Sequence, residues 1–192
     1  VDTTTVTLSS ATNGQIVTEG GSIVYTASVS NPVTGSPLTV TLSNGVVITI
    51  PVGASSANSE PVPVRGDDAY QQGEQDLSVT IGSTSGGNYE AVATTGTISN
   101  TVVDDSDVTT VTLLGPSSVV EGADSAIYTV TLSNEAPEGS IVTLAYRYIS
   151  ASGDDIVETA QAVIGPDGKT ATFTISTLTD SVYEGEESFE VF

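Results

Sequence analysis

Residues 38–50 read LTVTLSNGVVITI, and this stretch decides the fold of the region around it. Apolar and polar residues alternate on both sides of the central Asn44-Gly45 pair. An alternation of period two is typical of half-buried strands, and Asn-Gly tolerates the positive φ angles of a tight hairpin turn. The stretch therefore predicts a β-hairpin whose apolar face carries Leu38, Val40, Leu42, Val46, Ile48 and Ile50.

The same period extends outward along the chain. Ile23, Tyr25, Ala27 and Val29 share one predicted strand face. Pro63 interrupts the alternation of Val62 and Val64 and predicts an edge strand, because proline has no N–H to donate. Farther on, Val163-Ile164 and the alternating Ala171, Phe173 and Ile175 flank Pro166-Asp167-Gly168, which predicts a second hairpin. No segment shows the period of an amphipathic helix.

The chain also repeats itself. The stretch DTTTVTL at residues 2–8 returns as DVTTVTL at residues 107–113, and YTASVSN at residues 25–31 returns as YTVTLSN at residues 128–134. About seven short strands in each copy, separated by turns, are typical of an immunoglobulin-like sandwich. The sequence therefore predicts an all-β protein of two tandem Ig-like antiparallel β-sandwiches. The first module is expected at residues 1–107 and the second at residues 108–192, joined by a short Asp-rich linker.

The second copy matches only part of the first. Leu77 and Val79 recur as Phe189 and Val191, so that Phe192 corresponds to Thr80. No counterpart of residues 81–107 follows. We therefore expect the second module to be C-terminally incomplete and to lack its last strand in this sequence.

The composition excludes several functions. The chain has 24 acidic and 3 basic residues, a formal net charge of −21, and neither cysteine nor histidine. That charge repels nucleic acids and anionic membranes. The missing residue types exclude cysteine nucleophiles, Ser-His-Asp triads, and thiolate or imidazole zinc sites. We expect no enzyme, since glycosidase chemistry would need two carboxylates in a cleft and adjacent aspartates on turns do not indicate one.

Many of the acidic residues lie at predicted strand ends. Glu19 precedes one strand, Asp67-Asp68 follow another, and Asp104-Asp105 lie at the exit of the first module. If these strand ends meet at one tip, four or five carboxylates repel one another strongly without a cation. Ca²⁺ prefers six to eight oxygen ligands, whereas Mg²⁺ demands a tight octahedron. The alternative is that these are solvated turn residues, because aspartate favours turns by itself.

Two families resemble this sequence. In the second copy, Glu121-Gly122 before an early strand and YEGEESF at residues 183–189 resemble the Calx-β type of calcium-binding sandwich. The first copy more closely resembles the Ig-like extender repeats of bacterial RTX adhesins of the LapA kind. That resemblance rests on NPVTGSPLTV at residues 31–40, IPVG at residues 50–53 and VRGDD at residues 64–68.

The resemblance implies calcium ligands by position. In the first module these are Glu19, Asp67, Asp68, Asp104, Asp105 and Asp107, and in the second Glu121, Asp180 and Glu184. The sequence departs from this ligand set at two positions, each of which lacks a carboxylate that the other copy has. Gln71 stands where the second copy has Glu184, and Thr179 stands where the first copy has Asp67.

The resemblance implies calcium-rigidified spacer modules of a large bacterial cell-surface adhesin, extracellular and involved in adhesion and biofilm formation. Neighbouring modules of the same chain would be the partners, without nucleic acid or direct membrane contact, and other parts of the parent protein would bind its ligand. One alternative is a Calx-β-type calcium-responsive binding module, which should respond near micromolar calcium, whereas a spacer should bind weakly and stay saturated at millimolar calcium. Another is a terminal sugar- or protein-binding adhesin domain.

Overall fold

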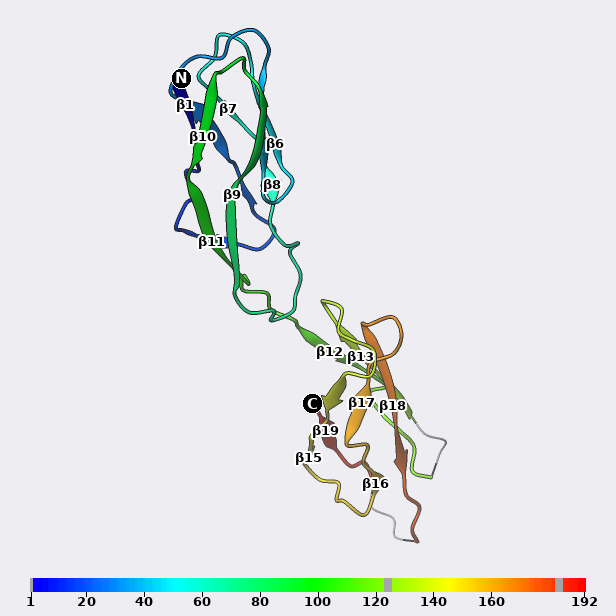
Figure 1. Ribbon diagram of the computed structural model, residues 1–192. Helices are drawn as coiled ribbons and strands as arrows, with labels where there is room; N and C mark the ends of the chain where they lie inside the picture. The colour runs from blue at the N-terminus through cyan, green and yellow to red at the C-terminus, as the bar shows by residue number, and fades with distance from the viewer. Residues whose placement is uncertain (1, 123–125, 182–184) are drawn as a thin grey trace. The chain divides into compact units, whose positions relative to one another are not determined.

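The structure is a computed structural model that describes residues 2–122, 126–181 and 185–192 (Figure 1). The described residues form strands, turns and loops, with no helix among them. The chain divides into two compact units, Val1–Asp107 (unit 1) and Val108–Phe192 (unit 2). Each unit contains several sheets around its own apolar cluster, so the predicted all-β sandwich class is confirmed.

Unit 1 is built from short strands with one long exception. Its strands are β1 (Thr3–Ser9), β2 (Ile16–Thr18), β3 (Ser22–Ile23), β4 (Thr26–Val29), β5 (Leu38–Leu42), β6 (Val47–Ile50), β7 (Ser56–Asn58), β8 (Val62–Pro63), β9 (Gln75–Gly86), β10 (Ala91–Thr95) and β11 (Thr97–Val103). One sheet has the order β10-β1-β4-β7 and the facing sheet the order β2-β11-β9-β5-β6, while β3 and β8 form a separate pair.

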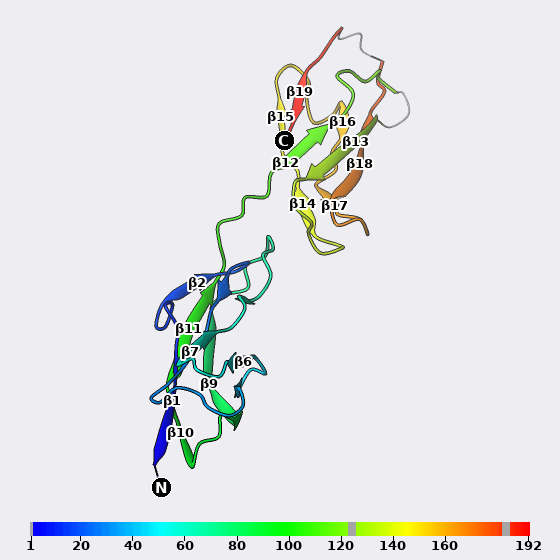
Figure 2. The same cartoon turned by 90° about the horizontal axis from the view of Figure 1, so that it is seen from above.

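Two pairings in unit 1 differ from the predicted antiparallel sandwich. β1 pairs with β10 in parallel, and β2 pairs with β11 in parallel (Figure 2). The segment from Ala91 to Val103 crosses from one sheet to the other at Gly96. Gly96 has a φ of +102°, and a Cβ there would lie 2.3 Å from the carbonyl oxygen of Leu8, so only glycine fits at the crossing.

The predicted hairpin of residues 38–50 is present as β5 and β6. Gly45 alone takes a positive φ, +85°, while Asn44 uses its carboxamide oxygen to accept a hydrogen bond from the N–H of Val46. Inward residues such as Leu38, Val40 and Ile50 are fully buried. The period-two alternation thus supplies the core of unit 1, as expected for a pleated strand with one face covered.

Unit 2 has the strands β12 (Val111–Leu114), β13 (Ala126–Leu132), β14 (Ile141–Thr143), β15 (Tyr146–Tyr148), β16 (Ile156–Val157), β17 (Gln161–Val163), β18 (Thr170–Thr177) and β19 (Phe189–Val191). One sheet has the order β12-β13-β18-β16, and the pairs β14-β17 and β15-β19 complete the unit. Its core includes the stacked rings of Tyr128 and Phe173, whose centroids are 5.3 Å apart.

The prediction of a second hairpin around residues 166–168 is wrong, because its two strands do not pair with each other. The chain does turn at residues 165–168, where the N–H of Gly168 donates to the carbonyl of Gly165. The two flanking strands then enter different sheets, because β17 pairs with β14 and β18 pairs with β13. A turn sequence fixes the reversal of the chain but not the partner of each strand.

Candidate metal centre

The parallel pairing of β2 with β11 brings two acidic segments to one end of unit 1. Thr18, the last residue of β2, is in register with Val103, the last residue of β11. The N–H of the next residue, Glu19, donates to the carbonyl of Val103 over 2.9 Å. Since parallel strands end at the same edge, Glu19 and the Asp104-Asp105 pair leave the sheet together.

Asp67 reaches the same place through the small β3-β8 pair. The antiparallel contact extends past these strands, because the N–H of Gly20 donates to the carbonyl of Arg65 over 2.9 Å. Asp67 follows two residues later in the same loop. Gly20 lies directly against it, since a Cβ on Gly20 would meet the Cβ of Asp67 at 2.9 Å.

The structure thus gathers the carboxylates of Glu19, Asp67 and Asp105, with one oxygen of each lying within 4.8 Å of the others. Calcium–oxygen bonds are about 2.3–2.6 Å long, so two ligands of one ion lie at most about 5 Å apart. The cluster meets that limit. The donors are all oxygen atoms, which suits a hard cation such as Ca²⁺ and leaves six to eight-fold coordination to be completed by backbone carbonyls or water.

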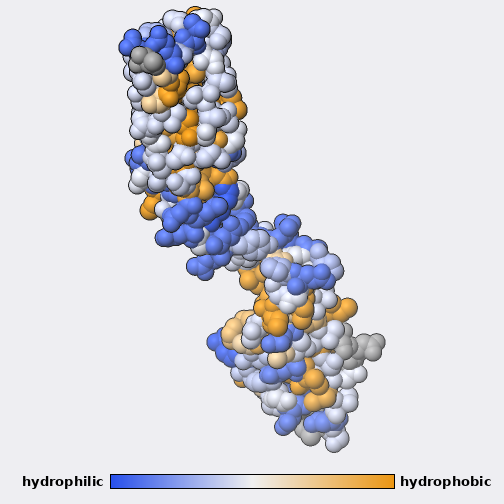
Figure 3. Space-filling model, in the orientation of Figure 1, coloured by the Kyte–Doolittle hydropathy of each residue, from blue (hydrophilic) through white to orange (hydrophobic). Residues whose placement is uncertain are grey.

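Glu19 is the buried member of this cluster. Its side chain is only 1% exposed, whereas Asp67 and Asp105 face solvent. A buried carboxylate is costly unless it is paired or coordinates a cation. Figure 3 shows that this end of unit 1 is predominantly hydrophilic.

Arg65 supplies part of the positive charge that the buried Glu19 carboxylate needs. Its Nε donates to Glu19 Oε2 over 3.1 Å, one Nη donates to Asp104 Oδ1, and the other donates to the carbonyl of Gly73 over 2.6 Å. Asp104 Oδ2 in turn accepts the N–H groups of Gln72 and Gly73. The Arg65 guanidinium therefore links the ends of β2 and β11 to the loop at residues 72–73. Its ion pairs go to Glu19 Oε2 and Asp104 Oδ1, so its positive charge is not spent on the other Glu19 oxygen, on Asp67 or on Asp105.

The electrostatics of Asp105 reflect this excess of negative charge. Desolvation raises the pKa of Asp105 above its usual 3.8, and neighbouring carboxylates raise it further. In decreasing order these neighbours are Asp107, Asp67, Glu19 and Asp104. A cation bound at this place would relieve a repulsion that the fold itself creates.

The other ligands implied for the first module lie outside the three-carboxylate cluster. Asp68 accepts the N–H of Tyr70 over 2.8 Å and also binds the side chain of Gln72, as a turn aspartate does. Asp104 is the partner of Arg65. Asp107 is exposed and acts on Asp105 through its charge.

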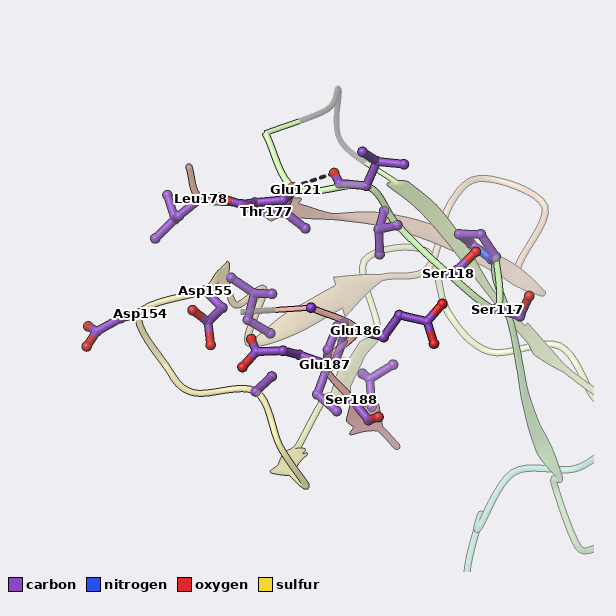
Figure 4. A pocket seen from close by; sticks show the side chains of 18 of the residues that line it. Ser117, Ser118, Glu121, Asp154, Asp155, Thr177, Leu178, Glu186, Glu187 and Ser188 are labelled. Carbon is purple, nitrogen blue, oxygen red and sulfur yellow. Dashed lines mark hydrogen bonds between the residues drawn. The ribbon is translucent and has the colours of Figure 1, made fainter. Parts of the chain in front are cut away.

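Unit 2 assembles less of such a site. Glu121 Oε1 accepts the N–H of Asp180 over 3.1 Å (Figure 4). Gly122 packs against Thr179 in unit 2 as Gly20 packs against Asp67 in unit 1. Thr179 therefore occupies the position at which unit 2 lacks a carboxylate, in agreement with the sequence comparison. Glu184 lies outside the described residues. Among the residues that are described, the only three-carboxylate group that could hold a metal is the one in unit 1.

Two functional residues were not singled out from the sequence. Arg65 is one of only 3 basic residues in the chain and directly precedes Gly-Asp-Asp, which is a sequence signal for a charge partner. Gly20 is the second such residue. Its φ of +72° and its contact with Asp67 explain why glycine follows Glu19.

We expect Gly20→Ala to weaken the site, and Gly14→Ala provides a matched control. Both glycines have nearly the same positive φ, +72° and +76°, but nothing lies within 4 Å of a Cβ at Gly14. Each substitution should cost about 1–2 kcal/mol of backbone strain. Gly20→Ala should cost more and should displace Asp67.

Chemical denaturation with and without calcium, together with a calcium titration, measures both effects. Gly20→Ala should shift the calcium midpoint to higher concentration, and Gly14→Ala should leave it in place. Equal midpoints for the two variants would show that the contact between Gly20 and Asp67 does not shape the site.

A β-sandwich module with a carboxylate cluster at one end is the class that this fold and site define. Comparison with models of protein families matches the LapA domain at residues 2–106, more than half of the chain. The chain therefore belongs to the LapA domain family, a family of adhesin modules rather than of enzymes. The described part of the chain contains no helix that is long and apolar enough to cross a membrane.

Other comparisons add less. No curated protein matches the sequence. Among solved structures, the apo form of the Calx CBD1 domain is 13% identical, with a TM-score of 0.37, over 53% of this chain and 98% of that one. The CBD12 structure from CALX1.2 is 11% identical, also with a TM-score of 0.37, over 90% of this chain and 76% of that one.

Proposed function

We propose that this protein is a spacer segment of a large bacterial surface adhesin, in which calcium at Glu19, Asp67 and Asp105 stiffens the exit of unit 1. The observation that carries the proposal is the convergence of three carboxylates from three separate segments within 4.8 Å. An ion held there would link the chain exit to the end of β2 and to the loop after β8. The exit segment would then move with the body of unit 1.

The length of the connection makes such stiffening effective. Asp105 belongs to the cluster, and Thr110 is already bound within unit 2, where its N–H donates to Ser133 Oγ and its carbonyl accepts the N–H of Ser133. Only residues 106–109 lie between these two anchored positions. Fixing Asp105 therefore removes much of the freedom that a short acidic linker would otherwise have.

The same proposal covers location, partners and chemistry. A module of this kind would work outside the cell, where calcium is millimolar and weak sites stay filled. Its partners would be neighbouring modules of the same parent protein, and ligand binding in adhesion and biofilm formation would fall to other regions. We propose no enzymatic activity and no contact with nucleic acid or membrane lipid.

Asp105→Asn should loosen the connection without unfolding either unit. The amide removes one charged ligand of the cluster, so calcium should hold the exit less firmly. Small-angle scattering in calcium should give a broader distribution of maximum dimensions for this variant than for the unchanged protein. Glu60→Gln, which alters an exposed carboxylate outside the cluster, serves as the control.

Circular dichroism of both variants establishes that the sandwiches remain folded. In EDTA the unchanged protein should scatter like Asp105→Asn. If the scattering of Asp105→Asn in calcium matches that of the unchanged protein in calcium, calcium at this cluster does not stiffen the connection.

A further inference from the structure

Arg65 is the only basic residue in unit 1, since the other two of the chain's 3 basic residues lie in unit 2. Its side chain is 15% exposed and donates to three separate segments: to Glu19 after β2, to Asp104 after β11, and to the carbonyl of Gly73. To turn into solvent, the guanidinium would have to break all of these hydrogen bonds. Its positive charge is therefore a fixed part of the surroundings of the carboxylate cluster.

Glu19 brings this charge close to a bound ion. Its Oε2 accepts the Nε of Arg65 over 3.1 Å, and its Oε1 accepts the N–H of Asp105 over 3.4 Å. A calcium ion lies about 2.3–2.6 Å from each oxygen that it binds, so an ion on either oxygen of Glu19 lies within about 8 Å of that nitrogen. The buried carboxylate thus serves two cations, one built into the chain and one from solution.

These two cations repel each other. Over about 8 Å, a unit charge weakens the binding of a divalent ion roughly fivefold at the dielectric constant of water, and further at the lower values found near protein surfaces. Solvent screens this repulsion incompletely, because the side chains of Glu19, Arg65 and Asp104 are 1%, 15% and 19% exposed. The expected size of the effect on calcium affinity is therefore about tenfold.

Arg65 also has an effect of the opposite sign. It holds Glu19 and Asp104 at the strand ends, and the affinity of a calcium site depends on the rigidity of its ligands as well as on their charge. The backbone already fixes these segments, because the N–H of Glu19 donates to the carbonyl of Val103 and the N–H of Gly20 to the carbonyl of Arg65. Neither bond involves the guanidinium, so the charge of Arg65 has the larger effect.

We propose that the positive charge of Arg65 sets the calcium affinity of unit 1 and keeps it in the weak range of about 10⁻⁴–10⁻³ M that extracellular modules use. Such a site fills at millimolar calcium and empties when calcium falls below that level. The connection after unit 1 then stiffens and loosens with the calcium concentration outside the cell. This inference rests on the proposed function, because it takes calcium at Glu19, Asp67 and Asp105 as given.

Substitutions at Arg65 test the proposal in the full chain. Arg65→Gln removes the charge and keeps an amide donor, so it should lower the dissociation constant for calcium about tenfold. Arg65→Lys keeps the charge and should bind calcium at least about fivefold more weakly than Arg65→Gln. Arg147→Gln makes the same change in net charge at a 65% exposed side chain of unit 2 and should alter the constant by less than about twofold. The amide NMR signals of Glu19 and Gly20 follow the titrations within unit 1.

A trivalent ion separates the effect of charge from an effect on ligand positions. The repulsion energy is proportional to the charge of the ion, so a tenfold gain for calcium corresponds to about thirtyfold for La³⁺. A residue that acts only by positioning ligands gives no such dependence on the charge of the ion. Titration with La³⁺ should therefore show the larger gain for Arg65→Gln, whereas Arg147→Gln should show no gain with either ion.

A second pair of variants leaves Arg65 in place and keeps the test valid if Arg65→Gln does not fold without calcium. Gln72 is exposed, and its N–H, which these substitutions retain, donates to Asp104. Gln72→Lys adds a positive charge beside the cluster, and Gln72→Glu adds a negative one. The lysine variant should have a dissociation constant for calcium at least about threefold above that of the glutamate variant.

Three results would overturn the proposal. The first is a folded Arg65→Gln variant that binds calcium no more tightly than the unchanged protein. The second is an equal gain for calcium and La³⁺, and the third is equal calcium affinity of the two Gln72 variants. If the Glu19 and Gly20 signals of the unchanged protein do not respond to calcium at all, the proposed function itself fails.

Discussion

Replacing Arg65 with methionine should cost unit 1 about 3–5 kcal/mol of stability in the absence of calcium, the usual penalty for removing one partner of a buried ion pair. The Glu19 side chain is 1% exposed and that of Arg65 15%, so the remaining carboxylate cannot recover its hydration in place. Methionine retains much of the aliphatic stem, which limits the loss of packing. Calcium should restore part of the stability, because the ion brings positive charge to the same carboxylates.

Arg147→Met is the matched control for this variant. Arg147 pairs with Glu190, but the two side chains are 65% and 45% exposed. Exposed pairs contribute about 0–1 kcal/mol, so this substitution should be almost silent. Urea denaturation of both variants in EDTA measures the difference. Equal losses would mean that the burial of Glu19 does not give Arg65 its structural role.

Removing calcium should have the second largest effect on the stability of unit 1. A ligand that binds only the folded state stabilises it by about 1.4 kcal/mol at ten times its dissociation constant and about 4 kcal/mol at a thousand times. For a unit of this size, each kcal/mol corresponds to roughly 4 °C in melting temperature. Calorimetry in calcium and in EDTA should therefore separate the unit 1 transitions by about 5–15 °C.

The same experiment with variants locates the effect. Asp67→Asn should shrink the separation, because Asp67 is one of the three clustered carboxylates, whereas Glu60→Gln should leave it unchanged. Moderate salt should be present throughout, so that general screening of the acidic surface is equal in all samples. Superimposed transitions in calcium and in EDTA would show that no stabilising calcium is bound.

The sequence predicts local structure well where the alternation is strong. Residues 38–50 form the expected hairpin, and the predicted inward residues are buried except Val46, which is only partly buried. Those features follow from neighbouring residues alone. The parallel pairing of β2 with β11 could not be predicted in this way, because it joins residues more than 80 positions apart and depends on the crossing at Gly96.

The candidate site was likewise predictable only in its local features. The acidic residues at strand ends are visible in the sequence, and the antiparallel sandwich predicted from it allows those strand ends to meet at one tip. Glu19 and Asp105 instead meet because parallel strands end together, which is a different cause. The separation of Asp104 from the cluster depends on Arg65, whose long side chain reaches across 39 residues of sequence. No local pattern specifies that reach.

Diffraction from crystals grown in calcium tests the central claim most directly. Data collected at a wavelength where calcium scatters anomalously show where the ion is bound. We expect an anomalous peak within about 2.3–2.6 Å of carboxylate oxygens of Glu19, Asp67 and Asp105. Crystals grown in millimolar calcium that show ordered carboxylates and no peak among these three residues would contradict the account.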